Sequence, residues 1–276
     1  MPELPEVETT RRSVAASLEG TTISQVVVER GRMLRRQPNP ADFARRLVRR
    51  KVHQVGRHGK FLLVTLDTDI IWVTHLGMSG RVSLVASDAP LAAHSNVVVT
   101  LDSGIDFRLV DPRTFGFVAA YTPEEFSESS ISQLGRDALT DLPRSRRLHD
   151  LFAGRSAPIK ALLLDQRIIA GLGNIYADET LHRARIGPHR PGGAITLDEA
   201  VALRRGIKET LNHALRYGGT SLDDLAYLLP DGRTGEYVNR LRAYGREGER
   251  CRRCGGTIVR EVIRQRSSFW CPQCQE

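Results

Sequence analysis

The first residues of the chain place two reactive groups side by side, Pro2 and Glu3. If the initiator Met1 is removed, Pro2 presents a free secondary amine, which can attack an aldehyde-like sugar carbon and form a charged iminium. An α-amino group titrates near pH ~8, so part of it is an unprotonated nucleophile at neutral pH. Glu3 can then move a proton at the same sugar. The alternative is a simple helix start, because a proline and acidic residues over 5–8 suit a first turn and the helix dipole.

Four cysteines near the C-terminus have the spacing of a metal site: Cys251, Cys254, Cys271 and Cys274. They form two CxxC knuckles separated by sixteen residues, and they are all the cysteines of the chain. Such knuckles can place four thiolates around one Zn²⁺, and a closed four-cysteine site is structural. The alternative, two disulfides in a secreted protein, is disfavoured because residues 1–20 do not resemble a secretion signal. We expect one structural zinc that folds a small hairpin.

The charge of the chain favours a polyanionic partner. Its 276 residues contain 40 Lys and Arg against 32 Asp and Glu, which gives a formal net charge of +8. Positive charge is concentrated over residues 45–60 and over 246–266, where seven arginines lie. Such an excess is typical of nucleic-acid binding. No apolar run approaches the ~20 residues of a membrane span, so we expect no membrane partner. We expect a monomer that acts in the bacterial cytoplasm or nucleoid.

The hydrophobic pattern predicts a β-rich N-terminal half and a helical C-terminal half. An apolar stripe over 4–18 predicts a helix that stops at Gly20, and turn-separated β-rich runs up to residue 121 predict a sandwich or barrel. A second stripe over 200–214 predicts a helix that ends at Gly218 and Gly219. The expected strands are Ile23–Val28, Phe61–Leu66, Ile70–Thr74, Arg81–Val85, Val97–Leu101 and Phe107–Val110.

Five motifs in order resemble the formamidopyrimidine-DNA glycosylase / endonuclease VIII family of DNA-repair enzymes. The motifs are MPELPE at the N-terminus, HLGMSG at 75–80, DPRTFG at 111–116, GNIYADE at 173–179 and the paired CxxC knuckles. Each is weak alone, but five in order across essentially the whole chain are a strong signal. Leu4 stands where the endonuclease VIII branch usually carries glycine, so the opening looks like the formamidopyrimidine branch.

The resemblance implies an α+β chain of three parts that binds double-stranded DNA with a damaged base. These parts are a helix-capped β-sandwich, a helix–two-turn–helix domain and a four-cysteine zinc-finger hairpin, with DNA in the cleft between domains. The expected boundaries are 1–121 for the catalytic sandwich, 122–147 for a linker, 148–240 for the helical domain, 218–240 within it for a lesion-capping loop, and 245–276 for the zinc finger.

By the same resemblance, four residues carry the reaction. Pro2 attacks C1′ and expels the base, and Glu3 donates and accepts the proton at the sugar. Lys60 donates a proton in β-elimination and contacts phosphate, and Arg266 grips phosphates and assists δ-elimination. Without the resemblance, Lys60 would be interpreted as a solvated strand-end lysine and Arg266 as an ordinary hairpin-tip arginine.

The resemblance also implies a set of DNA contacts. Met78, Arg113 and Phe115 are expected to fill the space left by a flipped-out nucleotide. Their alternative is a structural role, but their glycine-rich settings favour exposed loops. Asn174 is expected as an N-cap that donates to a phosphate at a helix start. The other expected DNA contacts are His75, His94, Arg155 and Lys160.

Three departures from the family pattern bear on lesion preference. Thr114 replaces the usual second arginine of the DPRRFG motif, which removes one cation near the void. Asn96 stands near His94 where the family often has a second histidine. The 218–240 loop carries Tyr237 where phenylalanine is common and an apolar Leu-Leu-Pro over 228–230.

The sequence favours a bifunctional glycosylase and AP lyase that excises oxidised purines such as 8-oxoguanine and formamidopyrimidines. Two alternatives stay open: an endonuclease VIII-like enzyme for oxidised pyrimidines, and a non-catalytic paralogue that binds damaged DNA. The intact Pro2 and Glu3 argue against the second. A generic zinc-ribbon module would explain only about the last thirty residues of the chain.

Overall fold

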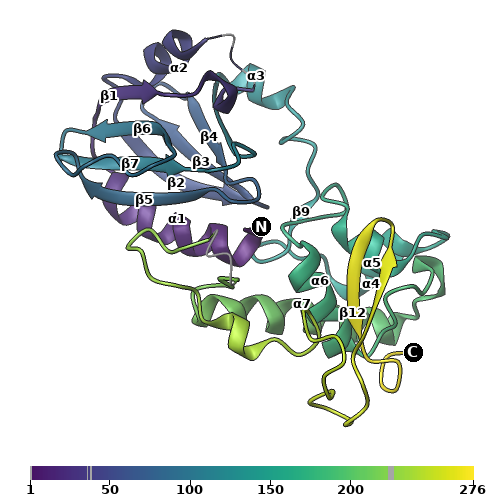
Figure 1. Cartoon of the computed structure of the whole chain (residues 1–276). Coiled ribbons are helices and arrows are strands. Elements are labelled where there is room, and N and C mark those ends of the chain that lie inside the picture. The colour runs from purple at the N-terminus through teal and green to yellow at the C-terminus, as the bar shows by residue number, and fades with distance from the viewer. Residues whose placement is uncertain (1, 36, 38, 223–226) are drawn as a thin grey trace. The chain divides into compact units, whose positions relative to one another are not determined.

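Helix α1 (Leu4–Leu18) begins and ends where the sequence predicts. The computed structural model describes residues 2–35, 37, 39–222 and 227–276 (Figure 1). Glu3 is the N-cap residue, and its backbone N–H donates to Glu6 Oε2 at 2.8 Å, which satisfies one donor of the first turn. The apolar face of α1, including Leu4 and Leu18, is fully buried. The start of the chain is therefore part of the folded core.

Two four-stranded antiparallel sheets form a sandwich around one hydrophobic core. The first sheet has the order β1-β6-β7-β5 and the second the order β2-β3-β4-β8. The bounds are β1 (Ile23–Val28), β2 (Val52–His58), β3 (Phe61–Leu66), β4 (Ile71–His75), β5 (Arg81–Ala86), β6 (Ser95–Leu101), β7 (Ile105–Val110) and β8 (Phe117–Tyr121). Helix α1 and helix α2 (Pro40–Leu47) pack against the same core, which confirms the helix-capped sandwich.

The six expected strands are present within two residues at each end, but β2 and β8 are not predicted by the sequence pattern. A register shift lies between Val52 and Gln54 of β2, so the buried Val52 and Val55 are three positions apart and no strict alternation appears. In β8, residues 118–120 are all fully buried, so this strand has no exposed face to signal it.

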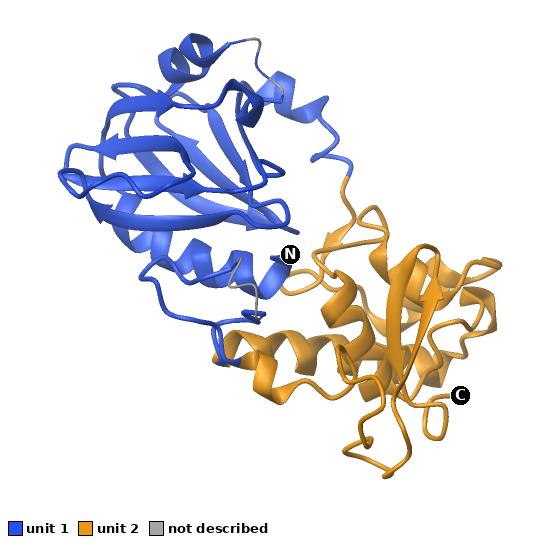
Figure 2. Ribbon diagram, in the orientation of Figure 1, with its two compact units in different colours: residues 1–133, 217–236 blue, residues 134–216, 237–276 orange. Residues whose placement is uncertain are grey.

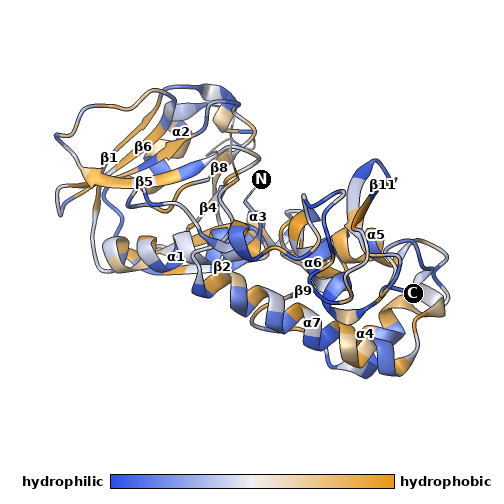
Figure 3. Cartoon of the chain, turned by 60° about the horizontal axis from the view of Figure 1, so that its bottom comes forward, coloured by the Kyte–Doolittle hydropathy of each residue, from blue (hydrophilic) through white to orange (hydrophobic). Residues whose placement is uncertain are grey.

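The second half of the chain is helical and ends in a β-hairpin. The 20-residue helix α7 (Leu197–Arg216) shows alternating hydrophobic and hydrophilic bands in Figure 3, and its predicted stripe of Ala200, Leu203, Ile207, Leu211 and Ala214 is fully buried. The other elements are α3 (Pro123–Ser127), β9 (Arg136–Asp137), α4 (Ser145–Phe152), α5 (Ile159–Leu164), β10 (Ile169–Ala170), α6 (Asn174–Ala184), β11 (Val259–Ile263), β12 (Arg266–Trp270), and the 3-10 turns η1 (Gly31–Met33), η2 (Gly192–Ala194) and η3 (Tyr237–Arg240).

Contacts divide the chain into two units that are interleaved in sequence (Figure 2). Unit 1 holds residues 1–133 and 217–236, and unit 2 holds 134–216 and 237–276. Most of the expected lesion-capping loop thus packs with the sandwich, and the expected linker contains α3, β9 and the start of α4. No helix in the described part of the chain is long and apolar enough to cross a membrane.

Candidate functional site

The N-terminal pair lies at the start of α1 in a buried setting. Pro2 is buried, and Glu3 is 1% exposed. Met1 lies outside the described residues, so its removal stays a prediction. A proline held at the first residues of a packed helix has little freedom to move, which suits a nucleophile that must meet one sugar atom.

Glu6 is a buried carboxylate that the sequence pattern marks only as favourable to the helix dipole. Its Oε2 accepts from the Glu3 N–H, and its Oε1 accepts from the Thr220 N–H at 2.7 Å. A Cβ on Gly219 would come within 2.6 Å of Glu6 Oε1, and Gly219 has a φ of +83°, so only glycine fits here. The loop that begins at Gly218 is therefore fastened to the helix that begins beside Pro2. The available signal in the sequence was the position of Glu6, an acidic residue three residues after the N-cap Glu3.

Described residues of this loop up to Gly235 also bond to one another within unit 1. Ser221 Oγ donates to the Tyr227 carbonyl and accepts from the Gly235 N–H, both at 2.8 Å. The Tyr227 hydroxyl donates to the Gly218 carbonyl at 3.2 Å. Residues 223–226 of the expected lesion-capping loop lie outside the described residues.

Tyr237, which the expected loop boundaries include, falls in unit 2, whereas residues 217–236 fall in unit 1. It is fully buried in unit 2, where its ring centroid lies 6.0 Å from that of Tyr176 and 5.3 Å from that of His213. The substitution of phenylalanine by Tyr237 is therefore a change in a helical core of unit 2.

Lys60 lies in the tight turn between β2 and β3. His58 pairs with Phe61, so Gly59 and Lys60 are the two turn residues, and Gly59 has a φ of +57°. Lys60 is 9% exposed. It is therefore largely enclosed, unlike the solvated strand-end lysine that was the alternative interpretation.

His75, at the end of β4, is a neutral imidazole with a defined tautomer. Its ring centroid lies 4.7 Å from that of Phe61 and 5.6 Å from that of Phe117. Burial, with smaller contributions from the charges of Lys60 and Arg35, lowers the pKa of His75 to about 4. Its Nδ1 accepts from the Gly77 N–H at 3.1 Å, so the ring proton is on Nε2. The imidazole is thus prepared to donate one hydrogen bond without carrying charge.

Two neighbouring loops expose the three expected void-filling residues. Met78 is 41% exposed and Phe115 is 39% exposed, and the Arg113 guanidinium lies 5.8 Å from the centre of the Phe115 ring. A Cβ on Gly77 would come within 2.4 Å of the Gly116 nitrogen, so the loops touch backbone to backbone. An exposed thioether, cation and aromatic ring on adjoining loops form the kind of surface that can enter a base stack.

Buried Asp111 fastens these loops together. Its Oδ1 accepts from Ser79 Oγ at 2.6 Å, and its Oδ2 accepts from the Gly116 N–H at 2.7 Å. Asn96 is 2% exposed and donates to the Asp111 carbonyl at 2.7 Å, while the Asp111 N–H donates to the His94 carbonyl. The Asn96 departure is therefore structural. His94 itself is exposed beside a cavity of about 440 Å³.

Thr114 occupies a strained position in the same loop, with a φ of +52° that is unfavourable for a β-branched residue. Its carbonyl accepts from Arg35 Nη2 at 3.1 Å. The Arg35 guanidinium thus reaches the 111–116 loop, in which Thr114 replaces the family's second arginine.

In unit 2, Lys160 and Asn174 both form hydrogen bonds to β12, the strand that begins at Arg266. Lys160 Nζ and Asn174 Nδ2 donate to the Ser267 carbonyl at 2.8 and 2.9 Å. Gly173, not Asn174, is the N-cap of α6, because the helix begins at Asn174 itself. Arg155 is exposed after α4, and Arg266 is exposed at the first position of β12.

Lys160, which was expected as a DNA contact, is fully buried, and its ammonium pairs with Asp178 at 2.7 Å. Burial raises the pKa of Asp178 to about 7, and Lys160 opposes this rise. The Asp178 carboxylate also accepts from the Phe269 N–H at 2.9 Å. The pair joins α5 and α6 to β12, which makes Lys160 a support of the hairpin that carries Arg266.

We expect Lys160→Ala to lower the free energy of unfolding by about 3–5 kcal/mol, because it leaves Asp178 buried without its cation. The double variant Lys160→Met/Asp178→Leu should recover most of this loss. Denaturant melts of the zinc-loaded protein measure both. The slope of log affinity for DNA against log salt should not change, since no phosphate contact is removed. A folded Lys160→Ala protein with a reduced slope would instead mean that the ammonium reaches DNA.

The four cysteines converge at the base of the C-terminal hairpin. Their sulfurs all lie within 4.8 Å of one another, with Cys251 Sγ 3.9 Å from Cys274 Sγ and Cys254 Sγ 3.5 Å from Cys271 Sγ. Tetrahedral zinc with Zn–S bonds of ~2.3 Å separates its sulfurs by about 3.8 Å, so the cluster fits one Zn²⁺.

The zinc knuckle is bound to the end of α6. His182 Nε2 lies 3.2 Å from Cys251 Sγ, and Arg253 donates to the carbonyls of His182 and Arg183 at 2.6 and 3.2 Å. The second interaction satisfies helix-end carbonyls with a cation, which also suits the helix dipole. Neither residue was predicted, although the arginine lies inside the first CxxC.

Three family models match the chain in order. They are the formamidopyrimidine-DNA glycosylase N-terminal domain over residues 1–118, the corresponding H2TH domain over 134–225, and the zinc finger found in FPG and IleRS over 248–276. Formamidopyrimidine-DNA glycosylases of Pseudomonas savastanoi pv. phaseolicola and Pseudomonas putida strain GB-1 are 39% and 41% identical, over 100% of both chains. The chain belongs to the formamidopyrimidine-DNA glycosylase family.

Solved structures of the family agree with this fold. The MutM (Fpg) protein of Thermus thermophilus is 37% identical with a TM-score of 0.88, covering 99% of this chain and 98% of that one. A point mutant of Lactococcus lactis FPG, crystallised with DNA containing Fapy-dG, is 29% identical with a TM-score of 0.91 over 100% of both chains. The expected fold, family, DNA-repair glycosylase class and single zinc site are thereby confirmed.

Proposed function

We propose that the chain excises oxidised purines from double-stranded DNA and then cleaves the strand through an iminium on Pro2. The Pro2 nitrogen attacks C1′, the bond from C1′ to the base breaks, and the base leaves with a proton. The C1′–O4′ bond then breaks, O4′ takes up a proton, and the opened sugar remains as an iminium, which acidifies its C2′ proton. Loss of that proton breaks the C3′–O bond, a second elimination breaks the C5′–O bond, and water releases the enzyme.

The observation that best supports this proposal is the buried Pro2–Glu3 pair at the start of α1, because the chemistry needs an amine and a carboxyl held together. Glu3 donates and accepts the proton at the sugar, Lys60 donates a proton in β-elimination, and Arg266 assists δ-elimination. Exposed Met78, Arg113 and Phe115 fill the vacated space. Four further residues contact the DNA: Asn174, His75, His94 and Arg155. The protein acts as a monomer in the bacterial cytoplasm.

The lesion preference is tested with duplexes that differ only in the damaged base: 8-oxoguanine, a formamidopyrimidine and an oxidised pyrimidine. One Lactococcus lactis Fpg structure contains DNA with an oxidised pyrimidine, so the pyrimidine is a necessary competitor. We expect faster single-turnover release of the purine lesions and strand ends that carry phosphate on both sides of the gap. Faster release of the pyrimidine, or binding without any release, would contradict the proposal.

Arg266 and His75 should differ in the salt dependence of DNA binding. Arg266→Ala should reduce the slope of log affinity against log salt by about 1, because a cation on a phosphate displaces a counterion. His75→Ala should weaken binding by about 1 kcal/mol at pH 7.5 with an unchanged slope, because an imidazole with a pKa of about 4 is neutral there.

The measurement is a salt titration of affinity at pH 7.5 for both variants. A slope that falls by about 1 for His75→Ala would show that the imidazole binds phosphate as a cation. An unchanged slope for Arg266→Ala would show that its guanidinium points to solvent.

A further inference from the structure

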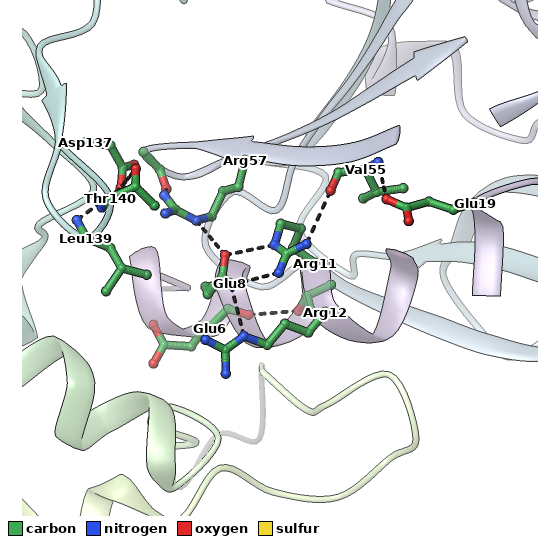
Figure 4. A network of polar contacts seen from close by, with 12 residues as sticks. Glu6, Glu8, Arg11, Arg12, Glu19, Val55, Arg57, Asp137, Leu139 and Thr140 are labelled. Carbon is green, nitrogen blue, oxygen red and sulfur yellow. Dashed lines mark hydrogen bonds and ion pairs between the residues drawn. The ribbon is translucent and has the colours of Figure 1, made fainter. Parts of the chain in front are cut away.

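Glu8, in the second turn of α1, is a carboxylate shared by three arginines (Figure 4). It is 7% exposed. Arg11 donates to both of its oxygens at 3.0 Å, Arg12 donates to Oε1 at 2.9 Å, and Arg57 donates to Oε2 at 3.1 Å. Burial works to raise the pKa of Glu8, but the bonds from these arginines outweigh it and hold the pKa below the ordinary value. The carboxylate is therefore charged at neutral pH.

Arg57 differs from the other two arginines in its position. Arg11 and Arg12 lie one turn from Glu8 on the same helix, where such pairs are common and weak. Arg57 comes from β2, and its side chain is 1% exposed. A guanidinium buried this deeply costs several kcal/mol unless it is paired, so helix stability alone does not explain its place.

The second end of the Arg57 guanidinium reaches the turn that carries Lys60. Arg57 Nη1 donates to the Gly59 carbonyl at 2.8 Å while Nε is held by Glu8. The peptide that joins Gly59 to Lys60 is planar, so fixing its oxygen also fixes the direction in which Lys60 leaves the turn. The planar fork of arginine can hold both partners at once, and a lysine ammonium lacks this shape.

Glu8 therefore connects the helix that begins beside Pro2 with the turn that carries Lys60. Both segments belong to unit 1. The path runs from the Glu8 carboxylate through the Arg57 guanidinium to the Gly59 carbonyl, and each step is a partly buried hydrogen bond.

We propose that Glu8 and Arg57 are positioning residues that hold the Lys60 amine in place for β-elimination. This proposal rests on the role of Lys60 in the proposed function. Elimination requires a proton donor at a fixed point near the departing oxygen, and a misplacement of about 1 Å can cost ~10²-fold in rate. The base-excision step, which starts with the Pro2 amine, depends less on this turn.

The test is a double-mutant cycle on a duplex with a preformed abasic site. Single-turnover β-elimination and borohydride trapping are measured for Arg57→Ala, Lys60→Ala and the double variant. We expect Arg57→Ala to slow elimination by roughly 10–100-fold while trapping persists, and to add no further loss when Lys60 is already alanine. Arg12→Ala, which removes a bond to the same Glu8, is the matched control and should keep the wild-type rate.

Arg57→Lys addresses the risk that the alanine variant unfolds, because it keeps a buried cation beside Glu8. It should melt close to wild type and still eliminate slowly, since one ammonium does not reproduce the fork. Equal losses from Arg57→Ala in both backgrounds, or a wild-type rate for Arg57→Lys, would overturn the proposal and leave the proposed function intact. A wild-type elimination rate for Lys60→Ala alone would remove both the assigned role of Lys60 and this proposal.

Discussion

A chain with one extra residue ahead of Pro2 is expected to bind damaged duplex but to form almost no borohydride-trapped complex. The extension converts the Pro2 amine into an amide, whose nitrogen lone pair is delocalised into the carbonyl and cannot attack C1′. The loss should reach about 10³-fold or more, the scale seen when a covalent nucleophile is removed. Retention of Met1 should have the same effect.

Trapping yield on 8-oxoguanine duplex and affinity on the same duplex are measured before and after proteolytic removal of the extension. Removal should restore trapping, which controls for misfolding. The variant Pro2→Gly replaces the secondary amine by a primary amine and should retain binding with far less trapping. Full trapping by the extended chain would exclude the N-terminal nitrogen as the nucleophile.

Zinc removal is expected to weaken DNA binding by at least about 100-fold without affecting the sugar chemistry directly. Structural zinc supplies about 10–16 kcal/mol to small finger modules, so the hairpin over 245–276 should unfold with a chelator or with Cys251→Ser. The effect should spread, because His182 and Arg253 bind the knuckle to α6. Arg266 would lose its fixed place at the start of β12.

Zinc content, anisotropy with labelled duplex, and trapping at saturating DNA separate these effects. Affinity should fall with zinc loss, whereas the trapping rate at saturation should fall much less. A metal-free protein with wild-type affinity would contradict a supporting role for the finger, and a complete loss of trapping at saturation would implicate it in chemistry.

The sequence predicts those helices and strands whose apolar residues repeat with a helical or strand period. The α7 stripe is fully buried as expected, and the four cysteines lie together, as the spacing of the two CxxC pairs predicts. The loops with Met78 and Phe115 are exposed as their glycine-rich settings indicated. These features depend on residues close in sequence, so local patterns are sufficient.

The sequence does not predict contacts that join distant segments through buried polar groups. Glu6 holds Thr220, Arg57 holds Glu8, and Lys160 holds β12. In each case the residue is of a charged type that usually lies on the surface, so the sequence alone does not indicate that it is buried. Only tertiary packing buries it. The assignment of residues 217–236 to unit 1 follows from the same kind of contact, since Glu6 ties the loop to α1.

The site of the covalent bond tests the central claim most directly. The complex formed with an 8-oxoguanine duplex is reduced with borohydride, digested and mapped by mass spectrometry. We predict a sugar remnant on the nitrogen of Pro2 in the N-terminal peptide, with Met1 absent. A remnant on Lys60 or on any other side chain, or no adduct while the lesion is still excised, would contradict the account.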